Sequence, residues 1–171
     1  MKMLVLLTLL WASAAFAQDP TAAARAAAGC GPSQVQFDAK TDEAAHALAQ
    51  PDAGKAMVYV FEDAFSVPTM RIGADGAWMG ATNSKTYIYF PLSAGNHNVC
   101  VEWQSNVFKK TAEKVGAAIS VNLEAGRIYY LRMTFEEIAQ GSGRIRLELA
   151  DNAEGQFLVS SSLLSESHPK K

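Results

Sequence analysis

Three histidines are the side chains of this chain that could transfer protons or bind a metal near neutral pH: His46, His97 and His168. None of them carries the paired-ligand spacing that zinc sites show. His46 falls in a polar loop and His168 in the C-terminal segment, whereas His97 follows the Gly95-Asn96 turn at the start of an expected strand. We therefore expect a structural role for His97, and the sequence predicts no metal site and no cofactor.

Carboxylates and serines give no catalytic pattern either. The acidic pairs Glu62-Asp63 and Glu136-Glu137 fall at the ends of expected strands, where adjacent side chains point to opposite faces. Neither pair can then converge on one bond, as glycosidase chemistry requires, and we expect both pairs to lie in solvated loops. Ser160-Ser161-Ser162 lacks the Gly-x-Ser-x-Gly context of a nucleophile elbow, and Gly141-Ser142-Gly143 is too short to cradle a phosphate. The sequence thus predicts no catalytic residues and a protein that is not an enzyme.

The two cysteines, Cys30 and Cys100, are candidates for a disulfide. An even count in an exported protein favours a structural bridge, and no CxxC motif points to redox chemistry. Such a bridge would stabilise the fold by about 4 kcal/mol in the chain-entropy model. Lipid attachment is the alternative, because Ala27-Ala28-Gly29-Cys30 resembles a lipoprotein processing site. However, the N-terminal apolar run ends near Phe16, too far upstream of Cys30 for such processing.

Aromatic residues concentrate in the expected strands, where core packing and cross-strand pairing explain them. Trp78 differs, because it directly follows the Asp75-Gly76 pair. Asp-Gly between two extended runs is a strong signal for a hairpin with a type I′ turn, which needs positive φ at both central residues. Asp75, Gly76 and Trp78 are therefore our candidates for contact with a partner protein or a sugar ring.

The elements that would position these residues are short strands separated by turns. Residues 57–61 form a continuous apolar run, which predicts a central strand buried on both faces. Residues 97–103 alternate, with Val99 and Val101 on one face and Cys100 on the other, so the Cys30 segment must pack over the face of Cys100. Further strands are expected at residues 35–40, 70–74, 77–80, 86–90, 118–123, 127–135 and 144–149.

Near the C-terminus, Asp151 or Asn152 is expected to cap a helix from Ala153 to about Leu164, followed by a charged tail, residues 167–171. Short strands, frequent turns and one helix together predict an all-β fold. We expect a single antiparallel β-sandwich, of the immunoglobulin or transthyretin kind, with a short C-terminal helix.

The N-terminus indicates export. Lys2, an apolar run over residues 4–16 and the small residues of Ala15-Phe16-Ala17 are typical of a cleaved signal peptide, residues 1–17; an uncleaved anchor is the alternative. We expect an N-terminal extension with a short strand over residues 18–53, the sandwich over 54–150, and the helix and tail over 151–171. The formal charge of −2 argues against nucleic acid or anionic membrane as a partner.

Several segments in this order are similar to the DUF2846 family of exported bacterial proteins. They are Gly54 to Phe61, Ile72 to Gly80, Tyr87 to His97 and Glu124 to Arg132. The resemblance covers about residues 54–150 and implies a small β-sandwich, often periplasmic or surface-attached, without catalytic residues to carry over. The P-x-x-x-G-x-H stretch from Pro91 is also similar to PEGA-type and carboxypeptidase-regulatory-like sandwiches, which are structural or interaction modules.

These observations predict an exported, non-enzymatic module of the cell envelope, periplasmic or extracellular, whose partner is an envelope protein or a glycan. The alternative function is binding of carbohydrate or peptidoglycan through exposed aromatic side chains such as Trp78.

Overall fold

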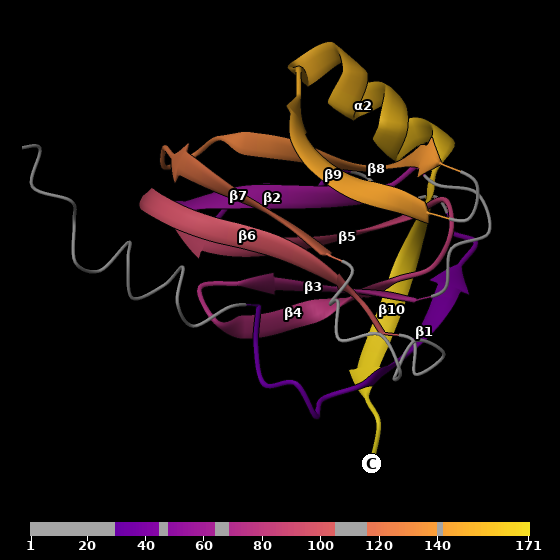
Figure 1. Cartoon of the computed structure of the whole chain (residues 1–171). Coiled ribbons are helices and arrows are strands. Elements are labelled where there is room, and N and C mark those ends of the chain that lie inside the picture. Colours follow the sequence, from indigo (N-terminus) through magenta and orange to yellow (C-terminus); the bar gives the residue numbers. More distant parts are fainter. Residues whose placement is uncertain (1–29, 45–47, 64–68, 105–115, 140–141) are drawn as a thin grey trace, which may run out of the picture.

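The computed structural model describes residues 30–44, 48–63, 69–104, 116–139 and 142–171 (Figure 1). The expected signal peptide and His46 lie outside these residues. The elements are β1 (Phe37–Asp42), β2 (Lys55–Glu62), β3 (Met70–Ala74), β4 (Ala77–Thr82), β5 (Thr86–Ser93), β6 (Gly95–Trp103), β7 (Gly116–Leu123), β8 (Ile128–Ala139), β9 (Ser142–Ala150), α2 (Asn152–Ser161) and β10 (Leu163–Pro169).

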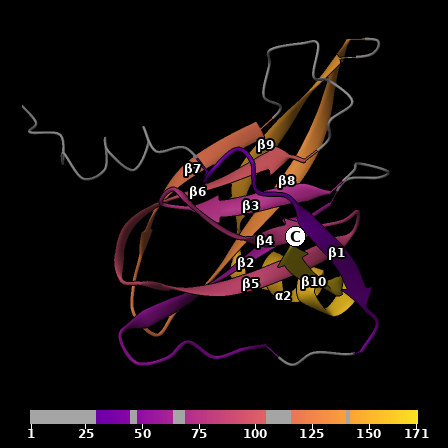
Figure 2. The same ribbon diagram turned by 90° about the horizontal axis from the view of Figure 1, so that it is seen from below.

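The strands form two sheets, one with the order β1-β10-β5-β2-β8-β9 and one with the order β4-β3-β6-β7. Helix α2 covers the face of the larger sheet that points away from the smaller one (Figure 1). The turned view shows β1 and β10 side by side at one end of the molecule (Figure 2). The prediction of an all-β fold with one short helix is confirmed.

The expectation of purely antiparallel pairing is wrong. Strand β8 runs parallel to β2, and β10 runs parallel to β5. Before β8 the chain passes through β6 and β7 of the smaller sheet, so it returns to the free edge of β2 by a crossover rather than by a tight hairpin. Local alternation in the sequence does not record the direction in which a strand re-enters a sheet.

Strand β2 lies inside the larger sheet and is buried on both faces, as predicted. Ala56, Val58 and Val60 face the smaller sheet, where they share a core with Ile72 and Val99 among others. Met57, Tyr59 and Phe61 face the other way and pack with Tyr87, Tyr130 and Leu158. The lack of alternation in this run therefore reflects two apolar layers rather than one.

Most of the expected charged tail belongs to a strand, because β10 extends to Pro169. Residues 164–169 of β10 pair with the whole of β1, and the Ser165 and Ser167 hydroxyls hydrogen-bond the main chain of Ala81 in β4. The helix ends at Ser161 and not near Leu164, because Ser162 is already extended. Strand β10 is fixed by main-chain pairing and serine contacts, which leave no apolar pattern in the sequence.

Helix α2 begins as predicted, with the Asp151 carboxylate accepting a hydrogen bond from the Glu154 amide. The helix docks through a close approach of its backbone to the ring of Tyr130. A Cβ on Gly155 would lie 2.1 Å from that ring. Gly155 is therefore the position where the helix meets the sheet.

We predict that Gly155→Ala lowers the free energy of unfolding by about 1–3 kcal/mol, because overpacking against Tyr130 outweighs the better helix propensity of alanine. Urea denaturation measures the change. Gln156→Ala, at an exposed position of the same helix, is the control and should change stability by less than about 0.5 kcal/mol. Equal stability of Gly155→Ala and wild type would contradict this docking geometry.

Candidate functional site

The Asp75-Gly76 turn joins β3 to β4 as predicted, with φ of 51° at Asp75 and 84° at Gly76. These values match a type I′ turn. The Asp75 carboxylate is turned back onto β6: Oδ1 accepts from the Asn98 amide at 3.0 Å, and Oδ2 lies 2.6 Å from Nδ1 of His97. The turn is thus fastened to the neighbouring strand.

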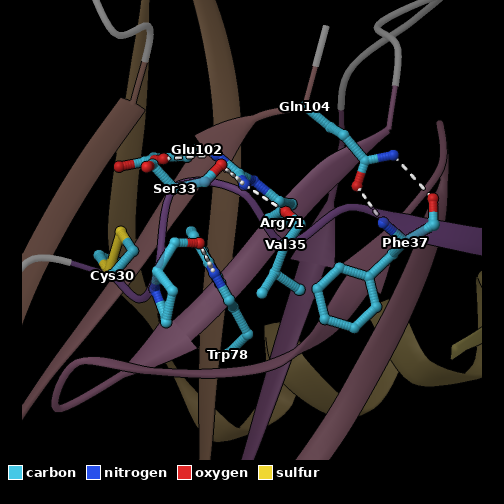
Figure 3. Close-up of polar contacts among 10 residues, drawn as sticks. Cys30, Ser33, Val35, Phe37, Arg71, Trp78, Glu102 and Gln104 are labelled. Carbon is cyan, nitrogen blue, oxygen red and sulfur yellow. Dashed lines mark hydrogen bonds and ion pairs between the residues drawn. A yellow bond between two sulfur atoms is a disulfide. The ribbon is translucent and has the colours of Figure 1, made fainter. Parts of the chain in front are cut away.

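The predicted bond between Cys30 and Cys100 is present, with 5.6 Å between the two Cα atoms. It holds the segment of residues 30–37, here called the N-terminal strap, over the outer face of the smaller sheet (Figure 3). A Cβ on Gly73 in β3 would lie 2.2 Å from the Cys30 carbonyl oxygen, so this close approach requires glycine. The prediction that the Cys30 segment covers the face opposite Val99 and Val101 is confirmed.

Arg71 of β3 links the smaller sheet to the strap. Its Nη1 donates to the carbonyl oxygens of Ser33 at 3.1 Å and Val35 at 2.5 Å, and its Nη2 pairs with Glu102 at 2.8 Å (Figure 3). The side chains of Arg71 and Glu102 are only 8% and 14% exposed. One buried guanidinium therefore satisfies two strap carbonyls and one carboxylate.

Trp78 contacts its own chain. Its indole Nε1 donates to the Pro32 carbonyl at 2.9 Å, its ring lies against Gly31, and the Arg71 guanidinium stacks 4.4 Å from the ring centroid (Figure 3). Contact of Trp78, Asp75 and Gly76 with a partner stays a prediction. Trp78 and Asp75 already carry intramolecular contacts, which the sequence did not indicate.

The far end of the strap is tied to the end of β6. The Gln104 side chain makes two hydrogen bonds to Phe37, accepting from its amide at 2.6 Å and donating to its carbonyl at 2.7 Å (Figure 3). The strap then continues into β1, so the chain passes from the smaller sheet to the edge of the larger one.

We predict that Arg71→Ala lowers the free energy of unfolding by about 3–5 kcal/mol, because it breaks a buried ion pair with Glu102 and removes the donor to two strap carbonyls. Arg127→Ala is the matched control. Its pair with Glu124 is 68% and 67% exposed, so the loss should stay below about 1 kcal/mol. Comparable losses in both variants, measured by chemical denaturation, would refute the role of Arg71.

His97 joins Asp75 and Ser93 in an arrangement that resembles a hydrolase triad. The Ser93 hydroxyl oxygen lies 3.4 Å from His97 Nε2, but the Ser93 carbonyl oxygen is nearer, at 2.9 Å. A carbonyl can only accept, so this contact requires a hydrogen on Nε2, which then cannot take the serine proton. The geometry gives His97 the structural role of joining two turns.

Glu62 ends β2 inside the molecule and is 1% exposed. Its Oε2 accepts from the Thr82 hydroxyl at 2.7 Å, whereas Oε1 has no hydrogen-bond partner among the described residues. Burial raises the pKa of Glu62 to about 7, and the Thr82 hydrogen bond opposes this only in part. The sequence pattern had assigned this residue to a solvated loop, which is wrong.

This raised pKa predicts that Glu62 makes stability fall with pH. Below about pH 4.5 both states are protonated. Between about pH 4.5 and 7, Glu62 is ionised in the unfolded chain but still protonated in the fold, so the free energy of unfolding falls as pH rises. Above about pH 7 this loss of stability, about 3 kcal/mol in total, is complete. Glu62→Gln should therefore gain stability relative to wild type across this window, measured by urea denaturation at several pH values. A pH-independent difference, like that expected of the exposed control Glu124→Gln, would contradict the prediction.

A cavity of about 350 Å³ lies beside α2, at the end of β2. We call it the α2 cavity. Its apolar residues are Phe61, Phe157 and Leu158, and its polar residues are Glu62, Asp63, Lys85, Arg132, Glu154, Ser161 and Ser162. Arg132 bridges Glu148 at 2.7 Å and Glu154 at 2.5 Å. The hydrogen bond to Glu148, together with the negative charge of Glu154, raises the pKa of the guanidinium. The sequence reasoning missed this cavity, because its residues come from four separate segments.

Within the described residues, no group of three or more His, Cys, Asp or Glu side chains is placed to hold a metal ion. The same part of the chain contains no helix with the length and apolar character needed to cross a bilayer.

A family described as "Protein of unknown function (DUF2846)" matches residues 52–143, more than half of the chain. Neither the curated proteins nor the solved structures give a significant match.

Proposed function

We propose that this protein, which belongs to the DUF2846 family, is exported and serves outside the cytoplasm as a non-enzymatic module of the cell envelope. In this role it acts structurally or by binding another envelope protein. We also propose that its two sheets are related to immunoglobulin- or transthyretin-like sandwiches and differ from them by the two parallel strand pairs.

The Cys30–Cys100 bond is the observation that supports export best. Disulfides persist in oxidising compartments and are rare where thiols are kept reduced. Here the bond anchors the whole strap and engages the buried sulfur of Cys30, which supports the proposal that no lipid is attached there. The signal-like residues 1–17 point to the same compartment.

The cluster of Ser93, His97 and Asp75 supports the proposal that the protein is not an enzyme. A serine hydrolase needs an Nε2 that accepts the serine hydrogen, and here the Ser93 carbonyl occupies that nitrogen. The two turns that His97 joins give the cluster a structural purpose instead.

Glycan binding is a second candidate function, and the α2 cavity favours it. Aromatic and paired charged side chains surround a cavity large enough for a small ligand. Trp78, the residue that the sequence singled out for this role, is a weaker candidate because its ring and its indole nitrogen are engaged by the strap.

Export predicts that the full chain, expressed in a bacterial host, yields a soluble periplasmic or secreted protein that begins near Gln18 and has no free thiol. Cell fractionation and mass analysis of the non-reduced protein measure both properties. A matched chain without residues 2–17 should remain in the cytoplasm with reduced cysteines. Cytoplasmic full-length protein, or mature protein carrying lipid on Cys30, would contradict the proposal.

If the protein is not an enzyme, the purified mature protein should show no turnover of ester, amide, glycoside or phosphoester substrates. Turnover that is present in the wild type and absent in both His97→Ala and Ser93→Ala would overturn it. Ser120→Ala, which alters another hydroxyl beside β6, is the control for indirect effects.

A further inference from the structure

We propose that the α2 cavity is a subsite for one neutral sugar ring, with Phe157 as the stacking residue and Arg132 and Glu154 as hydrogen-bonding residues. The inference rests on the second function proposed above, glycan binding, and gives it a location and a ligand class.

The apolar residues of the cavity are suited to the C–H face of a sugar ring. Phe61 and Leu158 are buried and form a fixed wall, whereas Phe157 is 67% exposed, the most exposed of the large apolar side chains. Ser161 donates to the Phe157 carbonyl, which holds the last turn of α2 that carries this ring. An exposed aromatic ring beside a cavity that also holds polar groups suits a ligand with one apolar and one polar face.

The charges beside the cavity favour a neutral ligand over an ion. Arg132 is already paired with Glu148 and Glu154, and Lys85 lines the same cavity as Asp63. An anionic ligand near Arg132 would also meet the Glu154 carboxylate, and a cationic ligand near Glu154 would meet the guanidinium. Hydroxyl groups avoid this conflict, because each can donate to a carboxylate and accept from a cation.

The guanidinium of Arg132 has donors beyond its two ion pairs. Nη1 is directed to Glu154 and Nη2 to Glu148, each nitrogen carries a second N–H, and the side chain is 32% exposed. A sugar hydroxyl that accepts from such an N–H and donates to Glu154 would join the network without breaking either ion pair. Adjacent hydroxyls on a ring supply such paired donors and acceptors.

The volume limits the ligand to a small one. About 350 Å³ lies at the low end of ligand pockets, which run from roughly 300 to 1,000 Å³. The cavity therefore suits one ring at a time and not an extended chain. Affinity should be weak, in the millimolar range typical of few contacts.

The test follows amide chemical shifts of the oxidised mature protein during titration with methyl glucoside and with N-acetylglucosamine. We expect saturable shifts at α2 and at the end of β2. Phe157→Ala should weaken binding by about tenfold, and Arg132→Lys, which keeps the charge but removes the forked guanidinium donors, should also weaken it. Phe135→Ala removes a 44% exposed ring of β8 that does not line the cavity, and should leave binding unchanged.

Saturable shifts at α2 with inorganic phosphate or glycine, and none with either sugar, would overturn the neutral-ring assignment. Sugar shifts that map elsewhere and survive Phe157→Ala would overturn the cavity assignment while leaving glycan binding in place. If neither sugar produces a saturable shift, the cavity assignment fails. Co-sedimentation with insoluble peptidoglycan then decides the second function separately, and the proposal of an exported module is unaffected by either result.

Discussion

The buried guanidinium of Arg71 is the contact on which the closed form of this protein depends. It binds the Ser33 and Val35 carbonyls and Glu102, and it stacks over Trp78. A buried cation is costly unless its charge is paired and its N–H groups are hydrogen-bonded. Here β6 supplies the Glu102 carboxylate, and the strap supplies two carbonyl acceptors. The disulfide fixes one end of the strap and Gln104 the other, so residues before β1 become part of the smaller sheet's outer layer.

The larger sheet has a different constraint, because β2 must fill two apolar layers at once. Its even-numbered residues meet the smaller sheet and its odd-numbered residues meet the aromatic cluster beneath α2. Where β2 ends, this double burial carries the Glu62 side chain out of water, with Thr82 as its hydrogen-bond partner among the described residues. The same strand end borders the α2 cavity, so packing and the proposed ligand site share one structural origin.

Local rules predicted local features correctly. The Asp75-Gly76 turn follows from the φ values that only such residues tolerate, and the alternation of β6 placed Cys100 opposite the core, which located the strap. Features that depend on contacts between segments far apart in the sequence could not be predicted from it. Three features are decided by neighbours that no short window contains: the parallel entry of β8, the pairing of β10 through its Ser-Glu-Ser-His run, and the burial of Glu62. The α2 cavity was missed for the same reason, while Arg71 gave no signal because an isolated arginine in a strand predicts a solvent-facing side chain.

Together these constraints describe a two-sheet fold in which the N-terminal strap binds Trp78 and the proposed ligand site lies on the side of α2. Amide hydrogen exchange of the oxidised and the reduced protein tests this account most directly. We expect slow exchange at Phe37, whose amide is bound by Gln104, and faster exchange confined to the strap and the outer face of β3 and β6 after reduction. Rapid exchange at Phe37 in the oxidised protein, or equal loss of protection in β2 and β5, would contradict it.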